Sequence, residues 1–372
     1  MINKDKNKIR HRRYQAGDEK QINELYFHVT GRQRSIEQFR WQWLNAPGGQ
    51  GEIWLIEYEQ PNGEVLLVGH HGVMPLRFSA GNLDLLVGKT ENTMVLPAYR
   101  KKILYTRFEQ RFLHEYESRF DATFSTMGPP AAIRLREALG YSAKHYWITN
   151  EWLIRAAAPL DFFASKVRSK HCYLATILNQ TSKVFPKVST KSQKHVLQLT
   201  ELTSEQAPVS SFFDDFWETA RSGYSIAPRR DKADLKWRFW DNPNINYFTL
   251  ISENNSIGDA YAVLSEIDEN IYQLDDFVCS PNSLELRSAM LVSVSNWVGD
   301  RGGSILKFVT TSDSTDQVVG GGGLRDLNSC FPFSLRESPK QYMPRRLCKN
   351  SQHYAKIRGM AWAVTPYLFQ GA

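Results

Sequence analysis

The sequence predicts an α/β (α+β) fold of two tandem domains, each a mixed, mostly antiparallel sheet flanked by helices. Its 372 residues exceed what one compact core usually holds, which favours two domains. Short β-branched stretches alternate with stretches whose apolar residues recur at helical spacing. The order of these elements in the first half returns in the second half. We therefore expect an N-terminal domain at 1–155, a basic linker at 156–195 and a C-terminal domain at 196–372.

The elements of the first domain follow from local signals. Asp18 has the residue type of a helix N-cap and precedes a helical pattern. Asn62-Gly63 lies between two apolar runs, which is typical of a β-hairpin. Gly140 ends a second helical pattern as a C-cap. The expected order is a strand (9–14), two helices (18–29 and 35–44), a hairpin (52–59 and 64–78), a strand (85–96), a helix (100–116), a strand (122–126), a helix (131–139) and a strand (146–154).

The junction between the strand at 85–96 and the helix at 100–116 carries the strongest chemical signal. Pro97 ends the strand because proline has no N–H to give to the ladder. A basic turn, Arg100-Lys101-Lys102, then opens the helix. Free N–H groups and the helix dipole favour an anion at such an N-terminus, and the basic side chains add charge. The junction predicts a phosphate-binding turn, with a solvated basic turn as the alternative.

The pattern Val95-x-Pro97-x-Tyr99-Arg100-x-Lys102, followed by an amphipathic helix, resembles the acyl-CoA-binding segment of GNAT-type (Gcn5-related) N-acyltransferases. The resemblance implies that the strand end pairs with the pantetheine arm and that the turn wraps the pyrophosphate. It places the contacts to acetyl-CoA or another acyl-CoA at Met94, Val95, Arg100, Lys101, Lys102, Ile103, Leu104 and Tyr105. Ile103 and Tyr105 stand at the two glycine positions of the family pattern. A side chain at 103 would obstruct the approach of backbone N–H groups to a phosphate.

A second motif lies at residues 131–141, which end in Leu139-Gly140-Tyr141. It resembles the last helix of the same family, so the resemblance covers about residues 8–155. The family's tyrosine, often the general acid that protonates the CoA thiolate, would fall at Arg136. Tyr141 and Tyr146 are nearby alternatives for this acid, although each also fits a packed aromatic side chain.

Acyl transfer to an amine needs a base for the amine proton and N–H donors for the tetrahedral oxyanion. The resemblance places these donors near Met94 and Val95. Glu91 lies three residues before Met94 and is the candidate base, with an exposed strand carboxylate as the alternative interpretation. His70 and His71 lie on the neighbouring strand and must point to opposite faces. We select Glu91, His71 and Tyr141 as catalytic candidates, while a core or surface role stays open for either histidine.

The second half repeats the first. Residues 39–47 align without a gap with residues 235–243, and residues 92–97 align with residues 276–281. Matched prolines close both pairs of segments: Pro47 with Pro243, and Pro97 with Pro281. The second copy has neither a basic turn nor a glycine after Pro281. The expected elements are two helices (212–221 and 232–240), a hairpin, a strand, a helix (284–298) and a strand (305–310), without the phosphate-binding motif.

The amino-acid composition indicates which kinds of ligand and which cellular compartment to expect for this protein. Lys and Arg exceed Asp and Glu by 46 − 39 = 7, which suits an acidic ligand but falls short of the signature of a specific DNA-binding protein. The four cysteines form no C-x-x-C pair or zinc pattern, so we expect no metal and a reduced, cytoplasmic setting. No apolar run approaches ~18 residues, so we expect no transmembrane segment. The basic, amphipathic stretch at 160–194 is either a connector packed on one domain or a peripheral membrane contact.

The resemblance implies an N-acyltransferase of the GNAT type that moves an acetyl or acyl group from acyl-CoA to a primary amine on a small molecule. Long tandem members are often bacterial and act in surface-polysaccharide pathways, which suggests an amino sugar as acceptor. One alternative is a Fem-type transferase that uses aminoacyl-tRNA, because the glycines are missing and the linker is basic. The other is an inactive GNAT scaffold that binds a partner. The acceptor, the acyl chain and the oligomeric state stay open.

Overall fold

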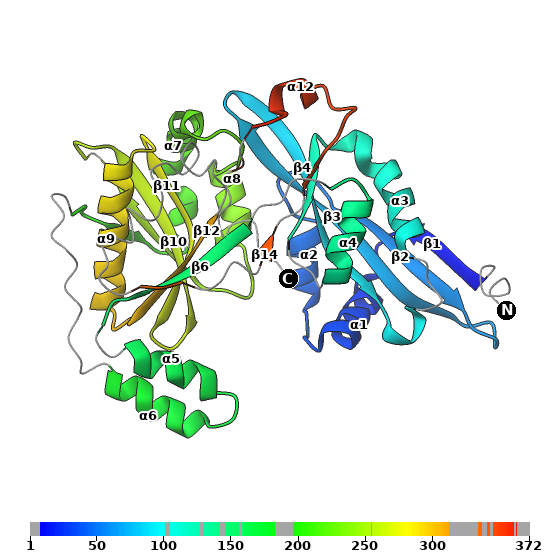
Figure 1. The fold of residues 1–372 in the computed structure, drawn as a ribbon, viewed down its shortest axis with the longest axis horizontal. Coiled ribbons are helices and arrows are strands. Elements are labelled where there is room, and N and C mark those ends of the chain that lie inside the picture. The colour runs from blue at the N-terminus through cyan, green and yellow to red at the C-terminus, as the bar shows by residue number, and fades with distance from the viewer. Residues whose placement is uncertain are drawn as a thin grey trace.

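The computed structural model describes residues 8–100, 105–126, 130–141, 146–155, 158–182, 196–253, 255–311, 334–336, 341–342, 345–360 and 362. These residues form a seven-stranded and an eight-stranded sheet, each flanked by helices, as the sequence predicts (Figure 1). The first sheet has the strand order β1-β2-β3-β4-β5-β15, and β8 pairs with β3. The second has the order β13-β6-β12-β11-β10-β9-β7, and β14 pairs with β6.

The bounds of the elements follow the predicted order closely. The strands are β1 (Ile9–Arg13), β2 (Glu52–Glu59), β3 (Val65–Ala80), β4 (Leu83–Val95), β5 (Ala122–Ser125), β6 (Tyr146–Leu153), β7 (Thr200–Leu202), β8 (Ala227–Pro228), β9 (Tyr247–Ser252), β10 (Asp259–Asp268), β11 (Ile271–Ser280), β12 (Ile305–Thr311), β13 (Ser334–Arg336), β14 (Gln341–Tyr342) and β15 (Arg345–Leu347). The helices are α1 (Glu19–Thr30), α2 (Ile36–Trp43), α3 (Tyr105–Tyr116), α4 (Pro130–Ala138), α5 (Ala158–Val167), α6 (Cys172–Ser182), α7 (Phe212–Ala220), α8 (Lys232–Leu235), α9 (Leu284–Asp300) and α12 (Tyr354–Ile357).

Two local details differ from the sequence prediction. Asp18 precedes α1 but does not cap it: its carboxylate instead accepts hydrogen bonds from Arg12 and from the backbone N–H of Gln15. The helix expected at 232–240 is α8 followed by a π-helix at Lys236–Trp240. The predicted hairpin turn is present, with Gly63 at a φ of 84° that glycine tolerates without strain.

Helices cover both faces of the first sheet. On one face, α1 and α2 pack in a core with α7 and the inner face of the second sheet, so the two halves share one hydrophobic core. On the other face, α3 and the end of α4 pack over β2 and β3. The second sheet is covered on its other face by α9.

The two sheets exchange strands. β6 follows α4 in the chain, yet it pairs antiparallel with β12 of the second sheet, from Leu153 opposite Ile305 to Trp147 opposite Thr311. In return, β15 pairs with β5 of the first sheet. The strand expected at 146–154 is thus confirmed as a strand but belongs to the second sheet and not to the first. Figure 1 shows β6 among the strands of the second half.

The sequence repeat coincides with a symmetric contact between the halves. Trp41 and Trp237 hold equivalent positions in the aligned segments, and their rings stack with centroids 5.7 Å apart. The indole N–H of Trp41 donates to the carbonyl of Trp237 at 2.5 Å, and the indole N–H of Trp237 donates to the carbonyl of Trp41 at 2.8 Å. This reciprocity is the pattern of an isologous interface, here built within one chain.

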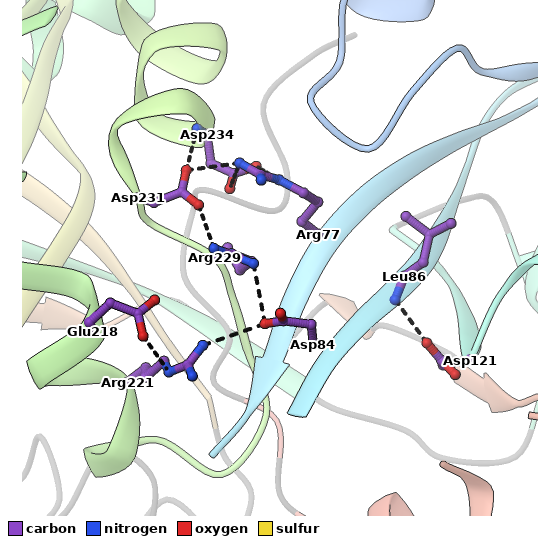
Figure 2. Close-up of polar contacts among 9 residues, drawn as sticks. All are labelled: Arg77, Asp84, Leu86, Asp121, Glu218, Arg221, Arg229, Asp231 and Asp234. Atoms are coloured by element: carbon purple, nitrogen blue, oxygen red, sulfur yellow. Dashed lines mark hydrogen bonds and ion pairs between the residues drawn. The ribbon is translucent and has the colours of Figure 1, made fainter. Parts of the chain in front are cut away.

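A chain of ion pairs fastens the second half to the tip of the β3–β4 hairpin (Figure 2). Arg77 of β3 contacts Asp231 at 2.8 Å and Asp234 at 2.6 Å. Arg229 joins Asp231 to Asp84 of β4, and Arg221 also contacts Asp84. Between them, β8 adds as a short strand to the edge of β3. The backbone of the second half therefore continues the first sheet at this point.

Candidate active site

The candidate site lies where β4 separates from β5. The two strands pair in parallel from Val87 opposite Ala122 to Thr90 opposite Ser125. β4 then continues to Val95, and among the described residues no strand pairs with it on the side of β5 beyond Thr90. Backbone N–H and C=O groups on that side are therefore available to pair with a ligand.

A bulge distorts β4 at the same place. Glu91 lies opposite Gly72, but Met94 lies opposite His70, so β4 holds one more residue than β3 over this interval. Asn92 accommodates the bulge with a φ of 51°, which asparagine tolerates better than most residues. Such bulges redirect side chains and often lie beside functional sites. Polar groups gather on both faces of the sheet around it.

The inner cluster, on the face covered by α1 and α2, comprises Arg34, Gln42, His70, Lys89 and Glu91. Lys89 is almost wholly buried and its Nζ lies 2.9 Å from Glu91 Oε2. Arg34 donates to Gln42 at 3.1 Å. The nearby carboxylate of Glu91 raises the pKa of Arg34 and so partly opposes the effect of burial. Burial nevertheless lowers the pKa of Arg34 to about 10 and also lowers the pKa of Lys89. The carboxylate of Glu91 thus sits among cations in a poorly hydrated space.

His70 belongs to the inner cluster and His71 does not, so the two imidazoles point to opposite faces, as expected. His70 Nδ1 lies 2.7 Å from the carbonyl oxygen of Asn92, which can only accept, so Nδ1 carries the proton. The ring also meets Trp43 edge to face. Gly72 permits this packing because a Cβ there would lie 2.2 Å from the Trp43 ring.

The outer cluster, on the face covered by α3 and α4, comprises His71, Thr93, Glu109, Arg136 and Tyr141. Arg136 is buried, forms an ion pair with the fully buried Glu109, and donates to Thr93 Oγ1 at 3.2 Å. His71 Nδ1 lies 3.4 Å from the same hydroxyl. Tyr141 is buried, and the Arg136 guanidinium lies 5.5 Å from its ring centroid. Thr93 is the exposed member, so it connects the buried groups to the point where β4 and β5 part.

Burial keeps both histidines neutral. It lowers the pKa of His70 to about 3, aided by the charge of Arg34 and opposed by the bond to the Asn92 carbonyl. Burial also lowers the pKa of His71 well below its usual value, and the charge of Arg136 acts in the same direction. His71 is in addition stacked against Phe112 and Tyr116. As a base it would be weak, and it reaches the site only through Thr93.

These shifts predict an acid-labile fold. Both histidines have a lower pKa folded than unfolded, so their stabilising effect is complete above about pH 6.5 and is lost as the pH falls. We expect His70→Gln to reduce the slope of unfolding free energy against pH, between pH 6 and 4, by up to about 1.4 kcal/mol per pH unit. Urea unfolding at several pH values measures it. The exposed His28→Gln is the control and should keep the parental slope, whereas an unchanged slope in His70→Gln would contradict the assignment.

The predicted cofactor contacts are only partly within the described residues. Met94 is buried and Val95 is half-buried on the free stretch of β4, and the exposed Arg100 donates through Nε to the Val95 carbonyl at 3.1 Å. Lys101, Lys102, Ile103 and Leu104 lie outside the described residues. Tyr105 is the first residue of α3, and its side chain is also outside them. The phosphate-binding role of the basic turn therefore stays a prediction. The structure describes the end of β4 before this turn and the start of α3 after it.

In the second half, two parallel strands also separate, but the residues at that point differ from those in the first half. β11 pairs in parallel with β12 only from Ile271 to Gln273, and a bulge interrupts β11 at Asp275. Asp275 holds the position of Glu91 in the repeat, but Gln273 replaces Lys89 and donates to Asp275 at 2.6 Å. Burial raises the pKa of Asp275 to about 7. The second copy therefore holds a buried carboxyl with a raised pKa where the first holds an ion pair.

Sequence reasoning missed several members of the two clusters. Arg34 was detectable, because Arg34-Ser35 aligns with Arg230-Asp231 five residues before the matched segments. Lys89 and Glu109 gave no signal, since a lysine in a strand and a glutamate in an amphipathic helix are usually exposed. Arg136 was noticed only as a departure from the family pattern, and the structure shows that it has a buried carboxylate partner.

Within the described part of the chain, no group of His, Cys, Asp or Glu side chains could hold a metal ion. No helix there has the length and apolar character that crossing a bilayer requires. No family model and no curated protein sequence matches the chain.

Solved structures do match. A conserved protein from Enterococcus faecalis V583, described as a probable N-acyltransferase, is 11% identical with a TM-score of 0.61, over 93% of this chain and 74% of that one. A GCN5-related N-acetyltransferase from Anabaena variabilis is 13% identical with a TM-score of 0.56, over 92% and 73%. Eis1 from Mycobacterium abscessus is 11% identical with a TM-score of 0.54, over 91% and 74%. The chain therefore has the fold of the GCN5-related N-acetyltransferases, as its motifs predict.

Proposed function

We propose that the protein is an N-acyltransferase that moves an acyl group from acyl-CoA to a primary amine on a small molecule. The observation that carries the proposal is the separation of β4 from β5 at a bulged stretch of β4 that precedes the start of α3; the basic residues Arg100, Lys101 and Lys102 lie between them in the sequence. The free edge of β4 can pair with the amide groups of a pantetheine arm. Residues 1–155 would supply this donor site, and residues 196–372 would support it and help to form the acceptor side.

The proposed reaction needs no covalent enzyme intermediate. The amine nitrogen attacks the thioester carbon, and Glu91 takes the proton that the amine loses. Backbone N–H groups near Met94 and Val95 stabilise the tetrahedral oxyanion. The intermediate collapses by breaking the C–S bond, and Tyr141 gives its proton to the CoA thiolate. Glu91 and Tyr141 belong to opposite faces of the sheet, which suits a thioester placed between them.

His71 has a supporting role in this proposal. Its ring stacks on Phe112, and burial together with the charge of Arg136 lowers its pKa, so we do not assign it the role of the base. Its Nδ1 and the Arg136 guanidinium both reach the Thr93 hydroxyl, and together they would fix that hydroxyl at the exposed end of the outer cluster. We therefore regard His71 and Arg136 as positioning residues.

An inactive scaffold is the second candidate, and one observation favours it. Arg136 stands where the family resemblance places the general acid, and it is held there by the buried Glu109. An arginine paired in this way does not protonate a thiolate. If Tyr141 cannot take over, the fold would bind ligands without turning them over.

Release of free CoA thiol tests the proposal. Purified protein is incubated with acetyl-CoA and with a panel of primary amines that includes amino sugars and polyamines. Free CoA thiol is measured, and the products are identified by mass spectrometry. We expect release of CoA that depends on one class of amine, with the acylated amine as the product. Binding of acetyl-CoA without any amine-dependent release would favour the scaffold. Co-purification of tRNA with no binding of acetyl-CoA would favour an aminoacyl-tRNA donor.

A further inference from the structure

The helical pair α5–α6 packs on one end of the second sheet, where Ala158 and Phe162 contact Ile271 and Ile305, and it has no counterpart among the described residues of the second copy of the repeat. In Figure 1 it lies at one end of the second sheet, away from the first half. Polar contacts fasten it to the turn between β10 and β11: Asp161 accepts from Asn270 at 3.1 Å, and Asn179 donates to Glu269 at 2.9 Å. Arg168 adds an ion pair with Asp268. The pair is therefore a fixed element of the fold.

The outward side of α6 is apolar. Tyr173, Leu174 and Ile177 are 78%, 43% and 45% exposed, and their spacing of i, i+1 and i+4 places them on one side of the helix. Ala175 and Asn179, on the opposite side, are fully buried. On α5, Phe163 is 52% exposed while Ala164 beside it is buried. Four large apolar side chains on one small helical pair are more than scattered surface exposure usually provides.

The helical pair and the sequence that follows it are rich in basic residues. The segment 156–195 contains seven basic residues and one acidic residue, for a net formal charge of 7 − 1 = +6: Lys166, Arg168, Lys170, Lys183, Lys187, Lys191, Lys194 and Asp161. Asp161 is buried and engaged with Asn270, while the charge of Arg168 is balanced by its ion pairs with Asp268 and Glu269. Lys166 and Lys170 are exposed. The remaining lysines follow α6 in the sequence.

We propose that α5–α6 binds the surface of an anionic bilayer, with Tyr173, Leu174 and Ile177 entering the interface and Lys166 and Lys170 contacting anionic headgroups. Apolar side chains bordered by lysines are the composition of interfacial helices, and each basic residue near an anionic leaflet adds to the attraction. A second copy of the same face would bring the same positive charge against itself. A nucleic acid would match the charge but would leave the apolar side chains uncovered. The inference does not depend on the proposed enzymatic activity.

Vesicle co-sedimentation tests the surface. We expect the full chain to sediment with vesicles of phosphatidylcholine and phosphatidylglycerol, to stay free with pure phosphatidylcholine, and to be released by high salt. Leu174→Ser with Ile177→Ser should weaken binding by on the order of tenfold. Lys166→Glu with Lys170→Glu should do the same at low salt. Val65→Ser with Val209→Ser is the matched control, because these apolar side chains are 51% and 77% exposed elsewhere, and it should bind like the parent.

A probe at Cys172 places the contact. Cys172 is exposed at the start of α6, whereas Cys279 and Cys348 are buried, so a Cys330→Ser background allows selective labelling with an environment-sensitive dye. We expect a blue shift of the emission on addition of anionic vesicles only. Absence of sedimentation, or sedimentation that neither the apolar nor the lysine double variant weakens, would overturn the proposal. It would also be overturned by a concentration-dependent dimer that Leu174→Ser with Ile177→Ser abolishes, because the face would then be an interface between copies.

Discussion

Replacing Glu91 by glutamine is expected to lower kcat for acyl transfer by about 100-fold to 10,000-fold, the usual contribution of a general base. The amide keeps the shape of the side chain but cannot accept the proton of the attacking amine. Binding of acetyl-CoA should change little, because Glu91 faces the inner cluster and not the basic turn. Measurement of kcat from CoA release, beside calorimetric titration of acetyl-CoA, separates the two effects.

The repeat supplies a matched control for this variant. Asp275 holds the position of Glu91 in the second half and is fully buried, and burial raises its pKa to about 7. Asp275→Asn should therefore retain kcat within about threefold. If Glu91→Gln and Asp275→Asn were equally active, Glu91 would not be the base, and the amine would have to lose its proton to water or to another group.

Replacing Arg230 by methionine is expected to lower the free energy of unfolding by about 3–5 kcal/mol. Arg230 is almost wholly buried and contacts both oxygens of Asp276, at 2.8 Å and 3.1 Å, while its Nη1 donates to the Pro228 carbonyl at 2.8 Å. Asp276 also accepts from the Tyr261 hydroxyl at 2.7 Å. The variant leaves a buried carboxylate without its counter-charge, which costs more than the lost hydrogen bonds alone.

Urea unfolding measures this effect, and two further variants show its origin. Lys236→Met removes one partner of a half-exposed ion pair with Asp241, and it should cost less than about 1 kcal/mol. Adding Asp276→Asn to Arg230→Met should recover part of the lost stability, since the unpaired charge is then absent. A loss below about 1 kcal/mol for Arg230→Met would show that the pair contributes little to the fold.

The two arginines of the repeat illustrate how the halves diverged. Arg230 and Arg34 hold equivalent positions, but only Arg230 has a bidentate carboxylate partner among the described residues. Arg34 instead reaches Gln42, and the nearby Glu91 pairs with Lys89. The second half uses the shared arginine for stability, whereas the first half keeps cations and a carboxylate next to the point where β4 and β5 part. This asymmetry agrees with a donor site in the first half.

Local sequence patterns predicted the elements well because their signals are local. Asn62-Gly63 identified its hairpin, the apolar and β-branched runs identified β2 to β4, and the repeated order of elements identified α9. The alignment of residues 39–47 with 235–243 even placed Trp41 and Trp237 in equivalent positions, which their reciprocal hydrogen bonds reflect. The fold class followed from these elements and from their repetition.

Long-range partners were beyond the reach of the same patterns. The apolar pattern of β6 shows that it is a strand but not which strand it pairs with, so its place in the second sheet could not be predicted. The ion pairs of Lys89 with Glu91 and of Arg136 with Glu109 join residues whose types usually indicate exposure. They become buried parts of a candidate site only because α1 and α2 cover one face of the first sheet and α3 and α4 cover the other.

Titration calorimetry with acetyl-CoA and free CoA tests the central claim, that the end of β4 and the basic turn bind an acyl-CoA. The decisive variant is Arg100→Ala with Lys102→Ala, and Lys166→Ala with Lys170→Ala is the control because it removes the same charge from a distant surface. We expect micromolar binding that the first variant weakens by at least about tenfold and the control leaves unchanged. Absence of binding to either ligand, or equal loss in both variants, would contradict an acyl-CoA site at this turn.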